Sequence, residues 1–148
     1  MAARRAGRTA LTFPQRGRIQ ITFDAHDPIA LATFWAEVLR YPPPDVDQMH
    51  ERLRTSNVPE DQLDNWMVIG DPNGVDPRLF FQRVPEPKTA KNRVHLDVRA
   101  SMQRDRAAID EEVTRLVKLG GRKLQGVEDF DTYFVVMQDP EGNEFCID

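Results

Sequence analysis

His95 is the residue whose type and position best suit chemistry. It is the one histidine of three that falls inside a strand pattern, Lys91–Arg99. A neutral imidazole can act as a general base near neutral pH. Asp97 is in phase with His95, so a strand would place both side chains on one face. The alternative interpretation, a histidine hydrogen-bonded and packed on the inward face of the strand, stays open.

Cys146 is the second residue with chemical potential, and it is the only cysteine of the chain. A single cysteine excludes a disulfide within the chain and indicates a reducing compartment. It falls in the last strand pattern, Glu144–Ile147. It is a candidate neighbour for His95, and the alternative is a small buried hydrophobic residue.

The first strand pattern is Ile19–Ala25, where apolar and polar residues alternate. Gln20, Thr22 and Asp24 therefore share the face opposite the apolar one. A helix is expected to follow at once, because Asp27 is a good N-cap and proline is well tolerated at the next position. The apolar stripe of this helix consists of Leu31, Phe34, Trp35, Val38 and Leu39.

Residues 42–64 interrupt the regular pattern. Pro42–Pro44 end the helix. The polar stretch that follows predicts a loop with one or two short helices, packed as a flap over the rest of the domain. Two strands are expected next, Trp66–Gly70 and Arg78–Val84, joined by the turn Asp71–Gly74.

The second half of the chain repeats this order. The strand that carries His95 is followed by a helix with Ser101 as a plausible N-cap, and Gly120–Gly121 end that helix. The turn Asp139–Asn143 has the same chemistry as the turn Asp71–Gly74. The strands of this half are expected at Lys123–Val127, Thr132–Met137 and Glu144–Ile147.

This internal duplication predicts an α+β fold built from two βαβββ modules. Their strands can form a curved, mostly antiparallel sheet with the helices outside, and its concave, polar face is a natural pocket for a small molecule. We expect module one at about residues 18–84, with an insertion at 42–64, and module two at about residues 92–148. Residues 1–17 are expected to form a flexible basic tail.

Length, charge and hydropathy narrow the class of protein. A chain of 148 residues is long enough for one domain with its own core. A net charge of −4 and a pI of about 5.4 argue against a nucleic-acid partner. No run is long and apolar enough for a secretory signal or a membrane span, so a cytoplasmic protein is expected. We also expect a homodimer, formed through sheet edges or helices.

Three stretches of the chain resemble the vicinal oxygen chelate superfamily, in particular its glyoxalase-like and bleomycin-resistance-like members. They are Gln20–Leu39 with its Asp-Pro helix start, Asn92–Val98, and the turn and strand Asp139–Cys146. Together with Arg78–Glu86 they span roughly residues 18–148. The resemblance implies, for metal-dependent members, a divalent ion in the curved sheet. His, Gln or Glu residues on the first and last strands of each module hold that ion.

The resemblance also assigns roles to particular residues. Gln20 and His95 match ligand positions on the first strands of the two modules, and a divalent Zn, Ni, Mn or Fe ion is the implied cofactor. Cys146 stands where the metal enzymes carry glutamate, and the remaining position falls on Phe80 or Gln82. That set contains no carboxylate, so the metal site is expected to be degenerate.

Three functional hypotheses follow. One is an enzyme: a divalent-metal-dependent lyase or isomerase resembling glyoxalase I, with Gln20 and His95 as ligands and His95 as the catalytic residue. Convergence of the polar candidates on one point would favour this enzyme, and an apolar Phe80 at that point would exclude it. A structural or regulatory interaction module is a third class. The main hypothesis, to which the enzyme is the alternative, is a protein that binds a small molecule in the concave pocket through Gln20, Gln82, His95, Cys146, Trp66 and Phe80.

Overall fold

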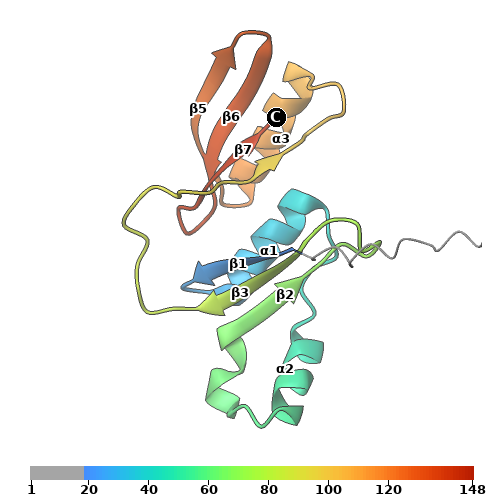
Figure 1. Cartoon of the computed structure of the whole chain (residues 1–148), viewed down its shortest axis with the longest axis vertical. Coiled ribbons are helices and arrows are strands. Elements are labelled where there is room, and N and C mark those ends of the chain that lie inside the picture. The colour runs from blue at the N-terminus through green and yellow to red at the C-terminus, as the bar shows by residue number, and fades with distance from the viewer. Residues whose placement is uncertain (1–18) are drawn as a thin grey trace, which may run out of the picture.

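The computed structural model describes residues 19–148, so the basic tail expected at residues 1–17 lies outside the described residues. Two groups of strands follow one another along the long axis of the molecule, with helices between and beside them (Figure 1). The elements are β1 (Gln20–Ala25), α1 (Pro28–Leu39), α2 (Val46–Thr55), the 3-10 helix η1 (Glu60–Asn65), β2 (Trp66–Ile69), β3 (Arg78–Arg83), β4 (Asp97–Val98), α3 (Arg106–Lys118), β5 (Arg122–Asp129), β6 (Thr132–Gln138) and β7 (Glu144–Ile147).

The described strands form two sheets with the same internal plan. In the first sheet, ordered β1-β3-β2, β1 is parallel to β3 and β2 is antiparallel to it. In the second, ordered β4-β7-β6-β5, β4 is parallel to β7 and the other pairs are antiparallel. The first strand of each module thus lies beside its last strand. The α+β class and the duplicated fold expected from the sequence are confirmed.

Within residues 19–148, module one has one strand fewer than module two. The sequence pattern predicts an insertion at residues 42–64, but this segment forms α2 and most of η1 at the point where module two has β5. The prolines at 42–44 prevent α1 from continuing. The Asp45 carboxylate then accepts a 2.9 Å hydrogen bond from the Gln48 amide as the N-cap of α2. A strand does not form here because the segment lacks the alternating apolar residues that a sheet buries.

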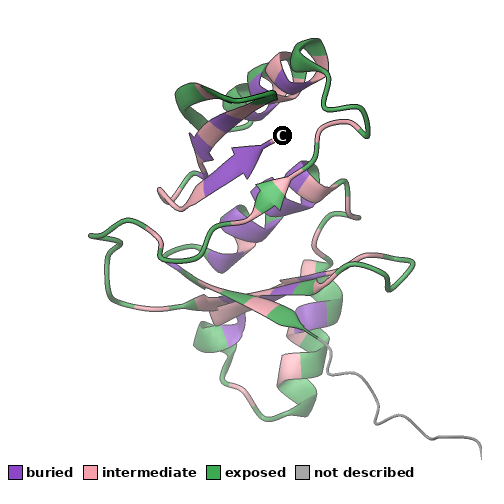
Figure 2. Ribbon diagram, turned by 45° about the horizontal axis from the view of Figure 1, so that its top comes forward, coloured by how far each residue is buried: buried purple, intermediate pink, exposed green. Residues whose placement is uncertain are grey.

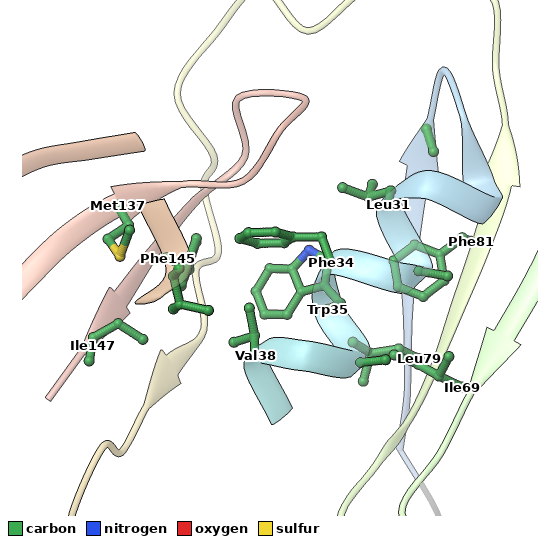
Figure 3. Close-up of a cluster of buried hydrophobic side chains, with 14 of the residues drawn as sticks. Leu31, Phe34, Trp35, Val38, Ile69, Leu79, Phe81, Met137, Phe145 and Ile147 are labelled. Carbon is green, nitrogen blue, oxygen red and sulfur yellow. The ribbon is translucent and has the colours of Figure 1, made fainter. Parts of the chain in front are cut away.

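Helix α1 lies between the two sheets and joins their apolar faces into one core (Figure 3). Leu79 and Phe81 of β3 lie on one side of the helix, and Phe145 of β7 lies on the other. The Trp35 ring centroid is 4.9 Å from that of Phe23 on β1 and 5.1 Å from that of Phe145. A helix that is apolar on several sides must be buried on all of them. This explains why α1 packs against both modules.

Helix α3 packs beside α1, on the same face of the second sheet. Arg115 Nη1 lies 3.0 Å from Glu37 Oε2, and Arg40 Nη2 lies 2.9 Å from Glu112 Oε2. The sequence pattern predicts one curved sheet with helices outside, whereas the described strands form two separate sheets with α1 between them. The reason is that α1 is buried on both sides: Phe34 and Trp35, two residues of the expected stripe, also contact Phe145 of β7. The polar faces of the two sheets therefore point away from each other.

Two boundaries also differ from the sequence-based expectation. The strand predicted at Lys91–Arg99 is regular only at Asp97–Val98. Helix α3 is capped by Asp105, whose carboxylate accepts a hydrogen bond from the Ala108 amide at 3.2 Å, and not by Ser101. The Ser101 hydroxyl accepts a hydrogen bond from the Asp105 amide and so supports the capping residue indirectly.

A buried carboxylate ties the turn before β7 to α1. Asp139 is 3% exposed and accepts hydrogen bonds from Trp35 Nε1 at 3.1 Å and from the Glu141 and Asn143 amides at 3.0 and 2.9 Å. Burial raises the pKa of Asp139, and these hydrogen bonds oppose the rise. In the matching turn of module one, Asp71 accepts backbone N–H groups of its own turn, which lower its pKa.

The buried residues gather on α1, on β7 and on the inward faces of the other strands (Figure 2). Exposed residues dominate α2, the loops and β5. Within residues 19–148, no helix has the length and apolar character that crossing a membrane requires.

Candidate functional site

The outward face of the second sheet brings His95, Asp97 and Cys146 together. Asp97 on β4 is paired with Cys146 on the parallel strand β7. His95 comes two residues before Asp97, and its Nε2 atom lies 3.4 Å from Asp97 Oδ1. One nitrogen, one oxygen and one sulfur atom from the three side chains all lie within 4.8 Å of one another. The three groups therefore converge on one point.

Backbone hydrogen bonds extend the pairing of β4 with β7 and so position these side chains. The Cys146 amide donates to the Leu96 carbonyl at 2.9 Å. Leu96 and Val98 pack against the core. Because side chains alternate along an extended chain, His95 and Asp97 face outward.

The three groups differ in exposure and in proton affinity. The side chains of His95 and Asp97 are 49% and 62% exposed, whereas Cys146 is 7% exposed. Burial, followed by the carboxylates of Asp97 and Asp148, raises the pKa of Cys146 to about 11 against the opposing charge of Lys91. In the absence of a cation, Cys146 is therefore a neutral thiol at pH 7.

A hollow of about 160 Å³ opens beside this cluster. Its walls include Thr132 and Phe134, which share the outward face of the sheet with Cys146 because Val136, in phase with both, is the partner of Cys146 in the register of β6 and β7. Arg104 Nη2 lies 3.3 Å from Asp148 Oδ2 at the same hollow. The walls thus combine an aromatic ring with a guanidinium group.

Gln20 and Gln82 lie in the other module and are engaged there. Gln20 Oε1 accepts hydrogen bonds from Arg78 Nε at 2.9 Å and from Arg78 Nη2. Gln82 Nε2 donates to Asp24 Oδ1 at 2.8 Å. Gln20 and Gln82 line two different hollows, and neither lines the hollow of His95. Within residues 19–148, the four polar residues expected to converge are not brought to one point.

Phe80 occupies the position in module one that corresponds to Cys146. It is paired with Thr22 on β1, just as Cys146 is paired with Asp97 on β4. Thr22 and Phe80 cannot reproduce the carboxylate and thiol of module two. An apolar side chain at this position cannot supply the fourth metal ligand that the resemblance implies.

Trp66 and Phe80 line a separate hollow of about 330 Å³ between α2 and the outward face of the first sheet. This hollow is referred to below as the α2 hollow. Besides these two aromatic residues it is lined by Met49, Arg52, Leu53, Ser56, Val58, Val68 and Arg78.

Arg52 and Arg78 hold positions of functional interest that were not selected from the sequence, and Asp97 was noted only as sharing a face with His95. Alternation along the strand of His95 was the available signal for Asp97. Arg52 follows Met49 at a spacing of three residues, which places both on one face of a helix. No local pattern brings Arg78 to the same hollow as Arg52, because that juxtaposition depends on how α2 packs against β3.

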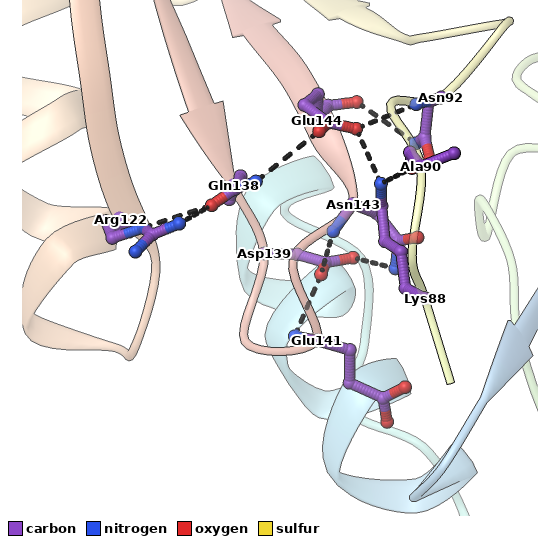
Figure 4. A network of polar contacts seen from close by, with 9 residues as sticks. All are labelled: Lys88, Ala90, Asn92, Arg122, Gln138, Asp139, Glu141, Asn143 and Glu144. Atoms are coloured by element: carbon purple, nitrogen blue, oxygen red, sulfur yellow. Dashed lines mark hydrogen bonds and ion pairs between the residues drawn. The ribbon is translucent and has the colours of Figure 1, made fainter.

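A polar network fixes the linker that leads to His95 (Figure 4). Glu144, at the start of β7, accepts a hydrogen bond from the Asn92 amide at 3.0 Å and lies 3.0 Å from Lys88 Nζ. Burial acts to raise the pKa of Glu144, but the Asn92 N–H and the Lys88 ammonium outweigh it and hold the pKa at about 2. The network anchors the linker to β7 a few residues before the cluster.

A second polar contact joins the modules at the N-terminus of α1. The Glu141 carboxylate accepts hydrogen bonds from the His26 and Asp27 amides at 2.7 and 2.8 Å. A carboxylate is stabilising at this end of a helix, where backbone N–H groups are unpaired. Glu141 also borders a hollow of about 860 Å³ that Gln82 and Lys88 line.

Two modules of this strand order, joined through one helix, define a class of duplicated α+β proteins. A profile of the glyoxalase-like domain matches residues 20–147. The chain therefore belongs to the glyoxalase-like domain family. No curated protein sequence matches the chain significantly.

Solved structures share the fold at low sequence identity. A glyoxalase/bleomycin resistance protein/dioxygenase family enzyme from Burkholderia phytofirmans PsJN has a TM-score of 0.60 and 15% identity, over 86% of this chain and 94% of that one. The fosfomycin resistance protein FosX from Mesorhizobium loti has a TM-score of 0.59 and 14% identity, over 90% and 91%. A glyoxalase-related enzyme from Fulvimarina pelagi has a TM-score of 0.58 and 17% identity, over 90% and 87%. These likenesses establish the fold alone.

Proposed function

We propose that this glyoxalase-like protein binds a small molecule beside a divalent metal ion held by His95, Asp97 and Cys146. The observation that carries the proposal is the convergence of nitrogen, oxygen and sulfur donors within 4.8 Å. Asp97 supplies the carboxylate that the set implied by the resemblance lacked. With Cys146 ionised on metal binding, the two anionic ligands balance the charge of a divalent ion.

The donor chemistry fits Zn²⁺ best among Zn, Ni, Mn and Fe. Thiolate and imidazole ligands suit Zn²⁺, whereas Mn²⁺ prefers oxygen ligands. Three protein ligands leave one tetrahedral position open, as in catalytic zinc sites. When bound, such an ion supplies Lewis-acid polarisation of an oxygen atom on the bound molecule.

The other residues of the hollow serve to bind and orient that molecule. The Phe134 ring offers an apolar face, and the Arg104 guanidinium offers N–H donors toward oxygen atoms. A molecule with a planar part and exposed oxygen atoms matches both. A cytoplasmic location suits this proposal, because a reducing compartment keeps the single thiol free for metal binding.

We also propose that a second copy of the chain completes the pocket. The outward faces of the two sheets point away from each other, so neither is closed by the other. Among the strands of residues 19–148, β1 and β4 are both edge strands, and an edge strand can pair with a strand of another copy. If β1 of one copy runs along β4 of the other, Gln20 comes close to His95.

Light scattering tests this homodimer. The measured mass is expected to be twice that of one chain, and the mass of a single chain at micromolar concentration would contradict the proposal.

The alternative function, a metal-dependent lyase or isomerase, depends on that homodimer. Gln20 and His95 hold equivalent positions in the two modules. Gln20 comes two residues before Thr22, which is paired with β3, and His95 comes two residues before Asp97, which is paired with β7. In the homodimer, Gln20 of the second copy would supply a fourth metal ligand, and its amide oxygen would then leave the Arg78 guanidinium. Gln20→Ala would then weaken metal binding in the dimer, and unchanged binding would remove the support for this alternative.

Metal content and thermal unfolding test the main proposal. Untagged protein is expected to carry about one equivalent of metal, and Zn²⁺ at 100 times its Kd stabilises the folded state by about 2.7 kcal/mol. This stabilisation is expected to vanish in His95→Ala and Cys146→Ala. The control is His50→Ala, because His50 Nε2 also contacts a carboxylate, Asp64 Oδ1 at 2.9 Å. Absence of metal and of any shift, or an equal shift in His95→Ala, would contradict the proposal.

A further inference from the structure

The α2 hollow has an apolar floor built from neighbouring strands. Val68 on β2 is directly opposite Phe80 on β3, and Trp66 lies two residues before Val68 on the same face. Met49 and Leu53 of α2 form the facing wall. The volume of about 330 Å³ lies within the range of roughly 300–1,000 Å³ that is typical of small-molecule sites. A flat apolar group would cover the half-buried aromatic rings.

The rim of the same hollow is positively charged. Its lining contains Arg52 and Arg78 and no aspartate or glutamate, although the chain has a net charge of −4. Within residues 19–148, Arg52 takes part in none of the ion pairs. Arg54, on the same helix, pairs with Glu60 at 2.8 Å. The hollow thus holds positive charge that no acidic residue of its lining neutralises.

Arg78 is held in place without being neutralised. Its Nε and Nη2 atoms donate to the amide oxygen of Gln20, which carries no charge. A guanidinium group has five N–H donors, so donors remain for a further acceptor. Arginine is well suited to a carboxylate, because its planar fork matches the two carboxylate oxygens.

We propose that the α2 hollow binds a small aromatic carboxylate. Its ring lies against Trp66 and Phe80, and its carboxylate lies between Arg52 and Arg78. This site lies on module one, requires no metal ion and is independent of the metal cluster of module two. It exists because residues 42–64 fold as helices over the sheet where module two has a strand.

Tryptophan fluorescence provides a direct readout, because Trp66 lines the hollow whereas Trp35, the only other tryptophan, is buried in the core. The probe is 3-phenylpropionate, titrated into the full chain after treatment with EDTA, with calorimetry as a second measurement. We expect saturable binding and a change in emission that is lost in Trp66→Phe. The neutral analogue 3-phenylpropionamide is expected to bind about tenfold more weakly, since it lacks the charge that the arginines recognise.

Arginine variants test the recognition of the carboxylate. Arg52→Gln and Arg78→Gln are each expected to weaken binding by about fivefold or more. Arg54→Gln, on the same helix but outside the lining, is the matched control and is expected to leave binding unchanged. Circular dichroism verifies that each variant is folded. Arg52 is exposed, so its replacement should not disturb folding.

Three results would overturn the proposal: no saturable binding, equal affinity for the carboxylate and the amide, or unchanged affinity in Arg52→Gln. Its failure is distinguishable from failure of the metal site. His95→Ala is expected to bind 3-phenylpropionate with unchanged affinity, because His95 lies outside this hollow. If binding of 3-phenylpropionate required His95 or added metal, the carboxylate would bind in module two, and this would contradict its assignment to the α2 hollow.

Discussion

Asp97 changes the chemistry of the candidate site more than any other single residue. Without Asp97, the ligands would be an imidazole and a buried thiol. Both are poor in negative charge, because the imidazole is uncharged and the Cys146 thiol is neutral near pH 7. The Asp97 carboxylate, 3.4 Å from the His95 ring, adds an anionic oxygen donor at the same point. Strand alternation alone indicates that these two side chains share a face, whereas the pairing with Cys146 required the fold.

Glu144 gives a pH-dependent prediction at the scale of one residue. Its pKa is held at about 2, below the ordinary 4.5, so its ionised form stabilises the fold above pH 4.5 and this contribution is lost as the pH falls toward 2. We expect Glu144→Gln to lower the free energy of unfolding by about 1–2 kcal/mol at pH 7. Urea unfolding at pH 7 and pH 3 measures both values, and the difference should shrink at pH 3.

The control for that prediction is Glu86→Gln, which replaces an exposed carboxylate on the same linker. It is expected to change the free energy of unfolding by less than about 0.5 kcal/mol. A loss in Glu144→Gln of equal size at pH 3 and pH 7 would show that the Glu144 charge is not the cause.

At the scale of elements, the two modules use the same turn chemistry for different purposes. Asp139 is buried beneath Trp35, whereas Asp71 bonds only within its own turn. We expect Asp139→Ala to cost about 2–4 kcal/mol, because it leaves the Trp35 N–H and two backbone N–H groups without partners. Asp71→Ala should cost about 1 kcal/mol or less. Urea unfolding of both variants compares these costs, and equal costs would contradict the assigned role of Asp139.

Several elements could be predicted from local pattern. The alternation of residues 19–25, the Asp-Pro start of α1 and the repeated turns each have a local physical cause, and the structure confirms them. The strand around His95 was predicted too long, because the linker before it is held to Glu144 by side chains and not by a ladder. The short helices of residues 42–64 were expected. The sequence of this segment alone does not show that they follow α1 at the point where module two has the strand β5.

At the scale of the whole molecule, α1 couples the two modules through a shared core. The sequence predicted the duplication and the apolar stripe of α1, but the stripe alone does not show that the helix packs against both sheets. We expect one cooperative unfolding transition, reported equally by tryptophan fluorescence and circular dichroism. Phe145→Ala, in module two, should lower the free energy of unfolding by about 3–5 kcal/mol and shift both signals together.

The control is Leu124→Ala on β5, because Leu124 is 44% exposed in the same module. It is expected to cost less than about 1 kcal/mol. Two separate transitions in the wild-type protein, with Phe145→Ala affecting one of them, would show that the modules are not coupled through α1.

The measurement that tests the central claim most directly is the absorption spectrum of the Co²⁺-loaded protein. Cys146 is the only cysteine, so a thiolate-to-cobalt charge-transfer band in the near ultraviolet can arise only from it. We predict this band at one equivalent of Co²⁺, its loss in Cys146→Ser, and changed visible bands in His95→Ala and Asp97→Asn. A Co²⁺ complex without the charge-transfer band, or a band that persists in Cys146→Ser, would contradict a metal site built from these three residues.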